Sequence, residues 1–189
     1  MRTYFLLVVV CALPLFFSAC GNTKQTDQQA LTDHAPAVET ETAGSTNVAV
    51  SARLAELGLT TNSEWRGINL GDAFGKVKAT EKGESFERDA EHVGYTVDIK
   101  NIQTMDILYY QTGGKVSAID VDLFLNSRQS VTDYQTDLVA YFTSLYGNVT
   151  ANDGSAVWAG AKRIRVTLTD VSKGKDFGLK IKMAPANAM

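Results

Sequence analysis

The chain contains few of the residues that build disulfide, metal or catalytic sites. Two Cys and two His occur in 189 residues, and no Cys follows Cys20. The sequence also lacks a Gly-x-Ser-x-Gly elbow, an HExxH helix and a phosphate-binding Gly-rich loop. A net charge of -3 gives no electrostatic reason to bind nucleic acid. We therefore expect no metal, no cofactor and no nucleic-acid partner.

The only long apolar run lies at the start of the chain. Met1-Arg2-Thr3 is followed by apolar residues from Tyr4 to Phe17 and then by Ser18-Ala19 before Cys20. A positive start, an apolar middle and small residues at a cleavage site are typical of a secretory signal. The run is shorter than the about 20 residues that a membrane-spanning helix needs. We therefore expect residues 1–19 to be removed as a signal peptide.

Residues Phe17-Ser18-Ala19-Cys20 resemble the bacterial lipobox, in which a signal peptidase cuts directly before a Cys that carries lipid. Phe17 stands where Leu is favoured. The resemblance implies that lipidated Cys20 anchors the protein to a membrane of the cell envelope. In a Gram-negative host, Gly21 after the Cys points to the outer membrane. The alternative is an ordinary secreted protein in which Cys20 lies near the cut by chance, but a lone unblocked thiol is a liability in an oxidising compartment.

The chain after Cys20 divides into two regions of different composition. Residues 20–47 are rich in Thr, Gln, Ala, Glu and Asp and contain no aromatic residue. Such a segment buries too little apolar surface to offset the entropy of ordering it. We expect residues 20–47 to form a lipidated, disordered tether and residues 48–189 to form a single globular domain.

Two helices are predicted in the domain. The clearer one runs from Val131 to Tyr146, with Ser130 as its N-cap and Gly147 at its end. Its apolar residues recur at helical spacing. A shorter helix is expected to start at Asp72, with Phe74 and Val77 facing inward, although glycine in this segment weakens it.

Six strands are predicted from alternating apolar residues. They are Tyr95–Ile99, Met105–Tyr109, Ile119–Leu125, Val157–Trp158, Ile164–Leu168 and Phe177–Met183. Gly113-Gly114 predicts a hairpin turn. The order is a helix and three strands, twice, which suggests an internal duplication. The predicted fold class is α+β, with a two-layer arrangement of an antiparallel sheet and two amphipathic helices on one face.

The run Ile68-Asn69-Leu70-Gly71-Asp72, the Gly113-Gly114 hairpin, Leu145-Tyr146-Gly147 and Val157-Trp158 resemble small secreted proteins of β-lactamase-inhibitor-protein-like fold. Small outer-membrane assembly lipoproteins share that fold. The resemblance covers roughly residues 65–183 and rests on structural positions. It implies an inhibitor or an assembly subunit, and it assigns no functional residue.

Charged residues alternate on several predicted strands. Asp120 and Asp122 project from one face of their strand and could ligate Ca²⁺ or act as an acid/base pair. Arg163 and Arg165 alternate in the same way, as do the lysines at positions 180 and 182. The favoured interpretation is that opposite charges meet across a solvated sheet face.

Two aromatic residues, Tyr110 and Phe124, are out of phase with the inward residues of their strands and are predicted to share the charged face. An aromatic pair ringed by charge suits protein binding; the alternative is packing against the tether or the first helix. We predict a non-catalytic module that binds another envelope protein through Tyr110, Asp120, Asp122, Phe124, Arg163 and Arg165. The alternative is an envelope enzyme or a binder of glycan or small ligands, which a deep pocket holding His92 beside carboxylates would favour.

Overall fold

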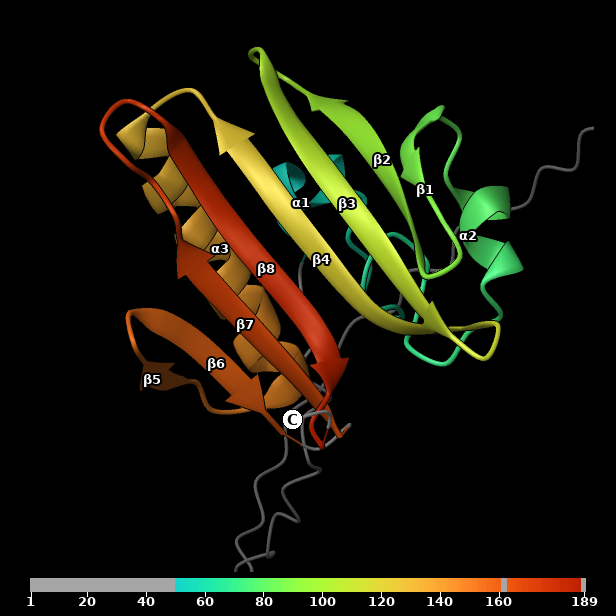
Figure 1. The fold of residues 1–189 in the computed structure, drawn as a ribbon. Coiled ribbons are helices and arrows are strands. Elements are labelled where there is room, and N and C mark those ends of the chain that lie inside the picture. The colour runs from blue at the N-terminus through green and yellow to red at the C-terminus, as the bar shows by residue number, and fades with distance from the viewer. Residues whose placement is uncertain (1–49, 161–162, 188–189) are drawn as a thin grey trace, which may run out of the picture. The chain divides into compact units, whose positions relative to one another are not determined.

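The computed structural model describes residues 50–160 and 163–187. Cys20, with the predicted signal peptide and tether, lies outside these residues. The described residues form one eight-stranded antiparallel sheet with helices against it (Figure 1). The predicted α+β class and the antiparallel sheet agree with this architecture.

Three helices and eight strands are found in the described residues. The helices are α1 (Ala52–Glu56), α2 (Gly75–Thr80) and α3 (Arg128–Tyr146). The strands of the first half are β1 (Ser85–Arg88), β2 (His92–Ile99), β3 (Gln103–Thr112) and β4 (Lys115–Leu125). Those of the second half are β5 (Thr150–Asn152), β6 (Ser155–Ala159), β7 (Ile164–Asp170) and β8 (Phe177–Pro185).

The strand order is β1-β2-β3-β4-β8-β7-β6-β5. Each half is a meander that runs from an edge strand to the centre, where β4 pairs with β8. The predicted hairpin between β3 and β4 is confirmed. Its turn residues Gly113 and Gly114 have φ values of 60° and 75°, a conformation that glycine adopts without steric cost.

Helix α3 begins three residues earlier than the sequence predicts. The N-cap is Ser127, which has an extended backbone. Its hydroxyl oxygen accepts a hydrogen bond of 3.1 Å from the Ser130 amide. The prediction of Ser130 as N-cap is therefore wrong, because Ser130 already lies in the first turn of the helix and its hydroxyl donates to Asn126. Gly147, with φ 88°, ends the helix as predicted.

The second amphipathic helix and the internal repeat are not confirmed. Helix α2 has 6 residues and buries only Val77, whereas α3 has 19 residues and buries six side chains. Strands β1 and β5 were not predicted. Neither buries a side chain fully, because each is an outer strand of the sheet, so their sequences lack the alternation that marks a strand.

The core lies between the sheet and the helices. Helix α3 packs across β4, β8, β7 and β6, and its Leu138 and Phe142 are fully buried. Trp65 and Trp158 are also fully buried in this core. Figure 1 shows α1 and α3 on the same side of the sheet. The described residues place no helix on the opposite side.

Candidate functional site: the open face of the sheet

The surface opposite the helices is formed by alternate residues of each strand. Met105, Ile107 and Tyr109 are fully buried toward the helices, so the residues between them point the other way. The strand register then aligns Asp106 with Asp122, and Asp122 with Lys180. We call this surface the open face. On β2–β4 it comprises His92, Thr96, Asp98, Thr104, Asp106, Leu108, Tyr110, Asp120, Asp122 and Phe124, and on β8 and β7 it comprises Lys180, Lys182, Arg165, Thr167 and Thr169.

The centre of the open face is a seam of ion pairs between β4 and β8. The Lys180 Nζ atom lies 2.7 Å and 2.8 Å from the two carboxylate oxygens of Asp122. Lys182 lies 3.5 Å from Asp120. The expectation that opposite charges meet across the face is thus confirmed for these two acids. Their cations come from β8 rather than from the arginines at 163 and 165.

The two predicted arginines differ in their backbone environment. Arg165 lies on β7 opposite Ala184 and belongs to the open face. Arg163 precedes β7 and has φ 56°, so the strand alternation does not extend to it. Its backbone instead bonds Gly160 and Ala186 at the end of the sheet. Arg163 therefore lies outside the strand that the alternating pattern assigned to it, and its place on this face stays a prediction.

Tyr110 lies in a cluster with His92 and acidic side chains. The ring centroids of Tyr110 and His92 are 5.4 Å apart. Burial raises the pKa of the Tyr110 hydroxyl, and the nearby Asp120 carboxylate raises it further. The two ring nitrogens of His92 each lie 3.1 Å from a carboxylate, Glu87 on one side and Asp89 on the other.

His92 links β2 to Glu87 on β1 and to Asp89, which follows β1. Asp89 also accepts hydrogen bonds from the Glu91 and His92 amides, which lower the pKa of its carboxyl group. Both ring nitrogens of His92 are engaged by carboxylates, and His92 does not line the cavities described below. Within the described residues no cluster of three or more His, Cys, Asp or Glu is arranged to hold a metal.

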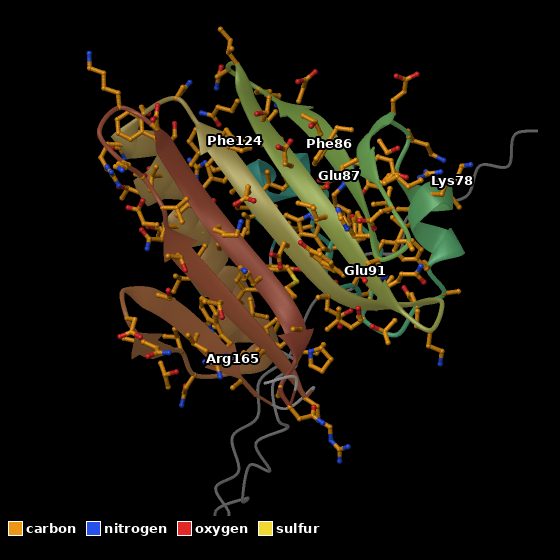
Figure 2. All side chains as sticks on the ribbon, in the orientation of Figure 1. Lys78, Phe86, Glu87, Glu91, Phe124 and Arg165 are labelled. Carbon is orange, nitrogen blue, oxygen red and sulfur yellow. The ribbon has the colours of Figure 1, made fainter. Side chains whose placement is uncertain are left out.

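Two exposed aromatic side chains lie on the open face. Phe86 and Phe124 are each 51% exposed, and Figure 2 labels both. The Phe86 ring lies over Gly94, where a Cβ atom would come within 2.6 Å of it. Phe124 borders a hollow of about 120 Å³ with Val171 and Phe177. Phe86 and Leu108 escaped prediction: Phe86 lies in a short polar segment, and Leu108 sits between two inward apolar residues.

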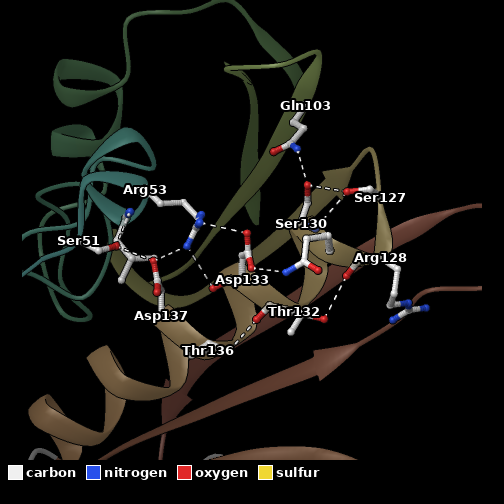
Figure 3. Close-up of polar contacts among 12 residues, drawn as sticks. Ser51, Arg53, Gln103, Ser127, Arg128, Ser130, Thr132, Asp133, Thr136 and Asp137 are labelled. Carbon is white, nitrogen blue, oxygen red and sulfur yellow. Dashed lines mark hydrogen bonds and ion pairs between the residues drawn. The ribbon is translucent and has the colours of Figure 1, made fainter.

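A cavity of about 280 Å³ lies elsewhere, between α1, the β2–β3 turn and α3. Its charged groups already have partners. Arg53 pairs with Asp133 at 3.2 Å and with Asp137 at 2.8 Å (Figure 3), and Lys100 pairs with Glu56. The Ser51 hydroxyl also donates to Asp137. We interpret this network as the attachment of α1 to α3, because it leaves no charged group free for a ligand.

Comparisons of the chain with protein-family models, with curated proteins and with solved structures find no match. Among the helices of the described residues, none combines the length and the apolar character required to cross a membrane.

Proposed function

We propose that this chain is a lipid-anchored protein of the bacterial cell envelope whose folded part is a non-catalytic protein-binding module. The anchor is Cys20, supported by the signal-like residues 1–19 and by the small residues before the Cys. Gly21 favours the outer membrane in a Gram-negative host. Residues 20–47 serve as the tether between lipid and domain.

The observation that carries the binding role is the uncovered sheet face. In the described residues α1 and α3 lie on the other side of the sheet and α2 lies at its edge, yet Phe86 and Phe124 remain half exposed here. Aromatic side chains are common anchors at protein interfaces, and charged residues typically surround them. Tyr110 and Leu108, both partly buried, lie on β3, one of the two strands between β1 and β4.

The acidic side chains of the open face that lack a cationic neighbour indicate the charge that a partner should carry. Asp98 and Asp106 on the β2–β3 part of the face have no cationic side chain within 4.0 Å in the described residues, whereas the acids of β4 are neutralised by β8. Asp106 accepts a hydrogen bond from the Thr96 hydroxyl at 2.6 Å. The partner that fits is an envelope protein presenting Lys or Arg beside an apolar side chain.

Site-specific crosslinking in intact cells tests this role. A photoreactive amino acid at position 124 should form a product with one partner, and the same amino acid at Val149 should not. Val149 is a matched control, since it is 41% exposed but follows α3 at the far edge of the sheet. Phe86→Ala and Asp106→Asn should each reduce the product at position 124.

The identity of the crosslinked segment decides the outcome. A partner peptide containing Lys or Arg next to an apolar residue supports the proposal. Equal products from positions 124 and 149, or an acidic partner segment, would show that the open face is not the binding surface.

The anchor has a separate test. Radiolabelled palmitate should enter the wild-type protein in its bacterial host, and Cys20→Ser should abolish the label and release the protein from the membrane fraction. An unmodified sulfur at position 20 in the mature wild-type protein, seen by mass spectrometry, would overturn the anchor.

The proposal extends to the origin of the fold. The order of a helix followed by four strands occurs twice, and the two meanders meet symmetrically at β4 and β8. We propose that the halves arose by duplication, with the helices diverging in length, and that the likeness to β-lactamase-inhibitor-protein-like folds has this basis. An experimental structure in which β1–β4 cannot be superposed on β5–β8 would reject the duplication.

A further inference from the structure

Two cavities adjoin on the helix side of the sheet, between α2 and β1. The first has a volume of about 200 Å³ and has Phe74, Val93 and Tyr95 as its apolar lining. The second, of about 490 Å³, shares Tyr95 with the first. Lys78 and Arg88 also line both cavities. We call this region the α2–β1 cleft; it lies on the opposite side of the sheet from the open face.

Three cations line the α2–β1 cleft. Lys82 lines only the second cavity and donates to the Ala79 carbonyl oxygen, whereas Lys78 and Arg88 line both cavities and have no anionic partner in the described residues. Neither Lys78 nor Arg88 has a carboxylate within 4.0 Å, although Lys76, on the same helix, pairs with Asp72 at 2.7 Å. Figure 2 shows Lys78 on α2 at the edge of the sheet. Lys78 and Arg88 thus provide positive charge beside an apolar cavity.

The acidic groups near the first cavity are already occupied. Asp89 accepts hydrogen bonds from the Glu91 and His92 amides and contacts the His92 ring. The second cavity is lined by two acidic residues. Glu81 is bound by Arg66 and Tyr109, whereas Glu84 forms no ion pair in the described residues. The first cavity therefore combines an apolar lining with two cations that form no ion pair in the described residues, beside an Asp89 carboxylate that the two amides and His92 already bind.

Tyr95 supplies an independent observation. Its side chain is buried to all but 3%, and its hydroxyl makes no hydrogen bond within the described residues. Among the described residues, the one side-chain polar atom that is fully buried and lacks a hydrogen-bond partner is the Trp65 indole nitrogen. The Tyr95 hydroxyl is therefore not fully buried, and it belongs to the small accessible part of this side chain. Since Tyr95 lines both cavities, the hydroxyl is available there to donate to an acceptor.

We infer that the α2–β1 cleft binds a small organic monocarboxylate with an apolar tail. The tail lies against Phe74 and Val93, and the carboxylate lies between Lys78 and Arg88. The Arg88 guanidinium can donate two parallel hydrogen bonds to it, and the Tyr95 hydroxyl can donate a third. At about 30 Å³ for each water-sized group, a cavity of about 200 Å³ holds roughly six or seven of them. A monocarboxylate of six carbons in all, with five of them in the tail, therefore suits the cavity.

Titration of the full chain with sodium hexanoate, followed by amide NMR shifts, tests the inference. Saturable shifts are expected at Val93, Tyr95 and the first residues of α2. Acetate lacks the tail and hexanol lacks the carboxylate, so each should bind at least about tenfold more weakly. N-acetyl-leucine also has a carboxylate and an apolar side chain, but it represents the C-terminus of a peptide. The tighter binder of the two shows whether the natural ligand is a free organic acid or a peptide end.

Substitutions separate this site from general attraction to positive charge. Lys78→Gln and Arg88→Gln should each weaken hexanoate binding about tenfold. Lys76→Gln is the matched control on the same helix and should change nothing. Tyr95→Phe removes a hydroxyl that has no partner in the described residues, so the fold should persist while affinity falls severalfold.

Three results would overturn the inference. They are the absence of saturable shifts with hexanoate and N-acetyl-leucine, hexanol binding as tightly as hexanoate, and equal affinities for the Lys76, Lys78 and Arg88 variants. None of these results bears on the open face, since crosslinking at position 124 reports on the other side of the sheet.

Discussion

At the scale of single residues, Glu81 holds together three segments of the first half. Its side chain is 2% exposed and is bound by the Arg66 guanidinium at 3.0 Å and by the Tyr109 hydroxyl at 2.6 Å. Arg66 also donates to the Leu57 carbonyl oxygen. Burial raises the pKa of Tyr109 far above its usual range, and Glu81 raises it further. Tyr109 is therefore a permanent donor to the carboxylate.

We expect Glu81→Gln to lower the free energy of unfolding by about 2 to 3 kcal/mol. Removing one partner of a buried ion pair costs about 3–5 kcal/mol, and the cost is smaller here because Arg66 keeps 22% of its side chain exposed. Urea denaturation measures the change. Glu84→Gln is the control: Glu84 is exposed and should alter stability by less than about 0.5 kcal/mol. Equal effects of the two variants would contradict the structural role of Glu81.

At the scale of elements, the start of α3 depends on Ser127. Its side chain satisfies the Ser130 amide, which has no partner within the helix. Ser127→Ala should therefore destabilise the protein by about 1 kcal/mol. Thr132→Ala, on the exposed surface of the same helix, should not destabilise it, because alanine has the higher helix propensity. Thermal unfolding of both variants distinguishes the cap from a general effect of serine or threonine removal.

The same end of α3 is tied to β7 by Arg128 and Asp170, whose side chains lie 2.5 Å apart. Burial raises the pKa of Asp170, but hydrogen bonds from Ser172 and Arg128 outweigh it, so the pKa is lowered overall. A carboxyl group whose pKa is lower in the folded state stabilises the protein above its unfolded pKa, about 3.9. That stabilisation disappears as pH falls through the folded pKa.

We therefore expect wild-type protein to lose more stability than Asp170→Asn between pH 5 and pH 2. The difference should remain below about 1 kcal/mol, because Arg128 is 55% exposed and water screens the pair. Urea midpoints measured across this range provide the test. Parallel pH profiles for the two proteins would show that Asp170 does not contribute to acid sensitivity.

At the scale of the whole molecule, the two halves share one sheet and one core. The sheet passes between them through the pairing of β4 with β8, and helix α3 covers strands from both sides of that seam. Ile181 lies at the seam opposite Val121, and both are fully buried. The halves should therefore unfold together.

Ile181→Ala should lower stability by about 2–5 kcal/mol. Because the halves are coupled, amide hydrogen exchange limited by global unfolding should accelerate equally in β3 and in β7. Faster exchange in β7 with unchanged exchange in β3 would show instead that the second half opens by itself.

Much of the fold was predictable because local patterns identify buried elements. The alternation in β3, β4, β7 and β8 and the Gly113-Gly114 turn predicted the central strands and their hairpin. The same patterns failed at β1 and β5, since outer strands need not bury every second residue. They also misplaced the cap of α3, because Ser127 and Ser130 are equally plausible until the backbone of each is known.

The candidate site was predictable only in part. The two-residue spacing placed Asp120, Asp122, Lys180 and Lys182 on faces of their strands, but it did not say which strands are neighbours. Phe86 gave no signal, because its position over Gly94 depends on how β1 pairs with β2. The α2–β1 cleft likewise joins residues of one helix and two strands that share no sequence motif.

The sequence by itself determined the inward and outward faces of the long elements, because side chains alternate with a period fixed by the backbone. Only the tertiary structure decided that β4 lies beside β8 and that, within residues 50–160 and 163–187, the helices leave one side of the sheet open. Strand order depends on packing between residues far apart in the chain, and no local pattern encodes it. The pairing of Asp122 with Lys180 and the exposure of Phe86 and Phe124 follow from that order.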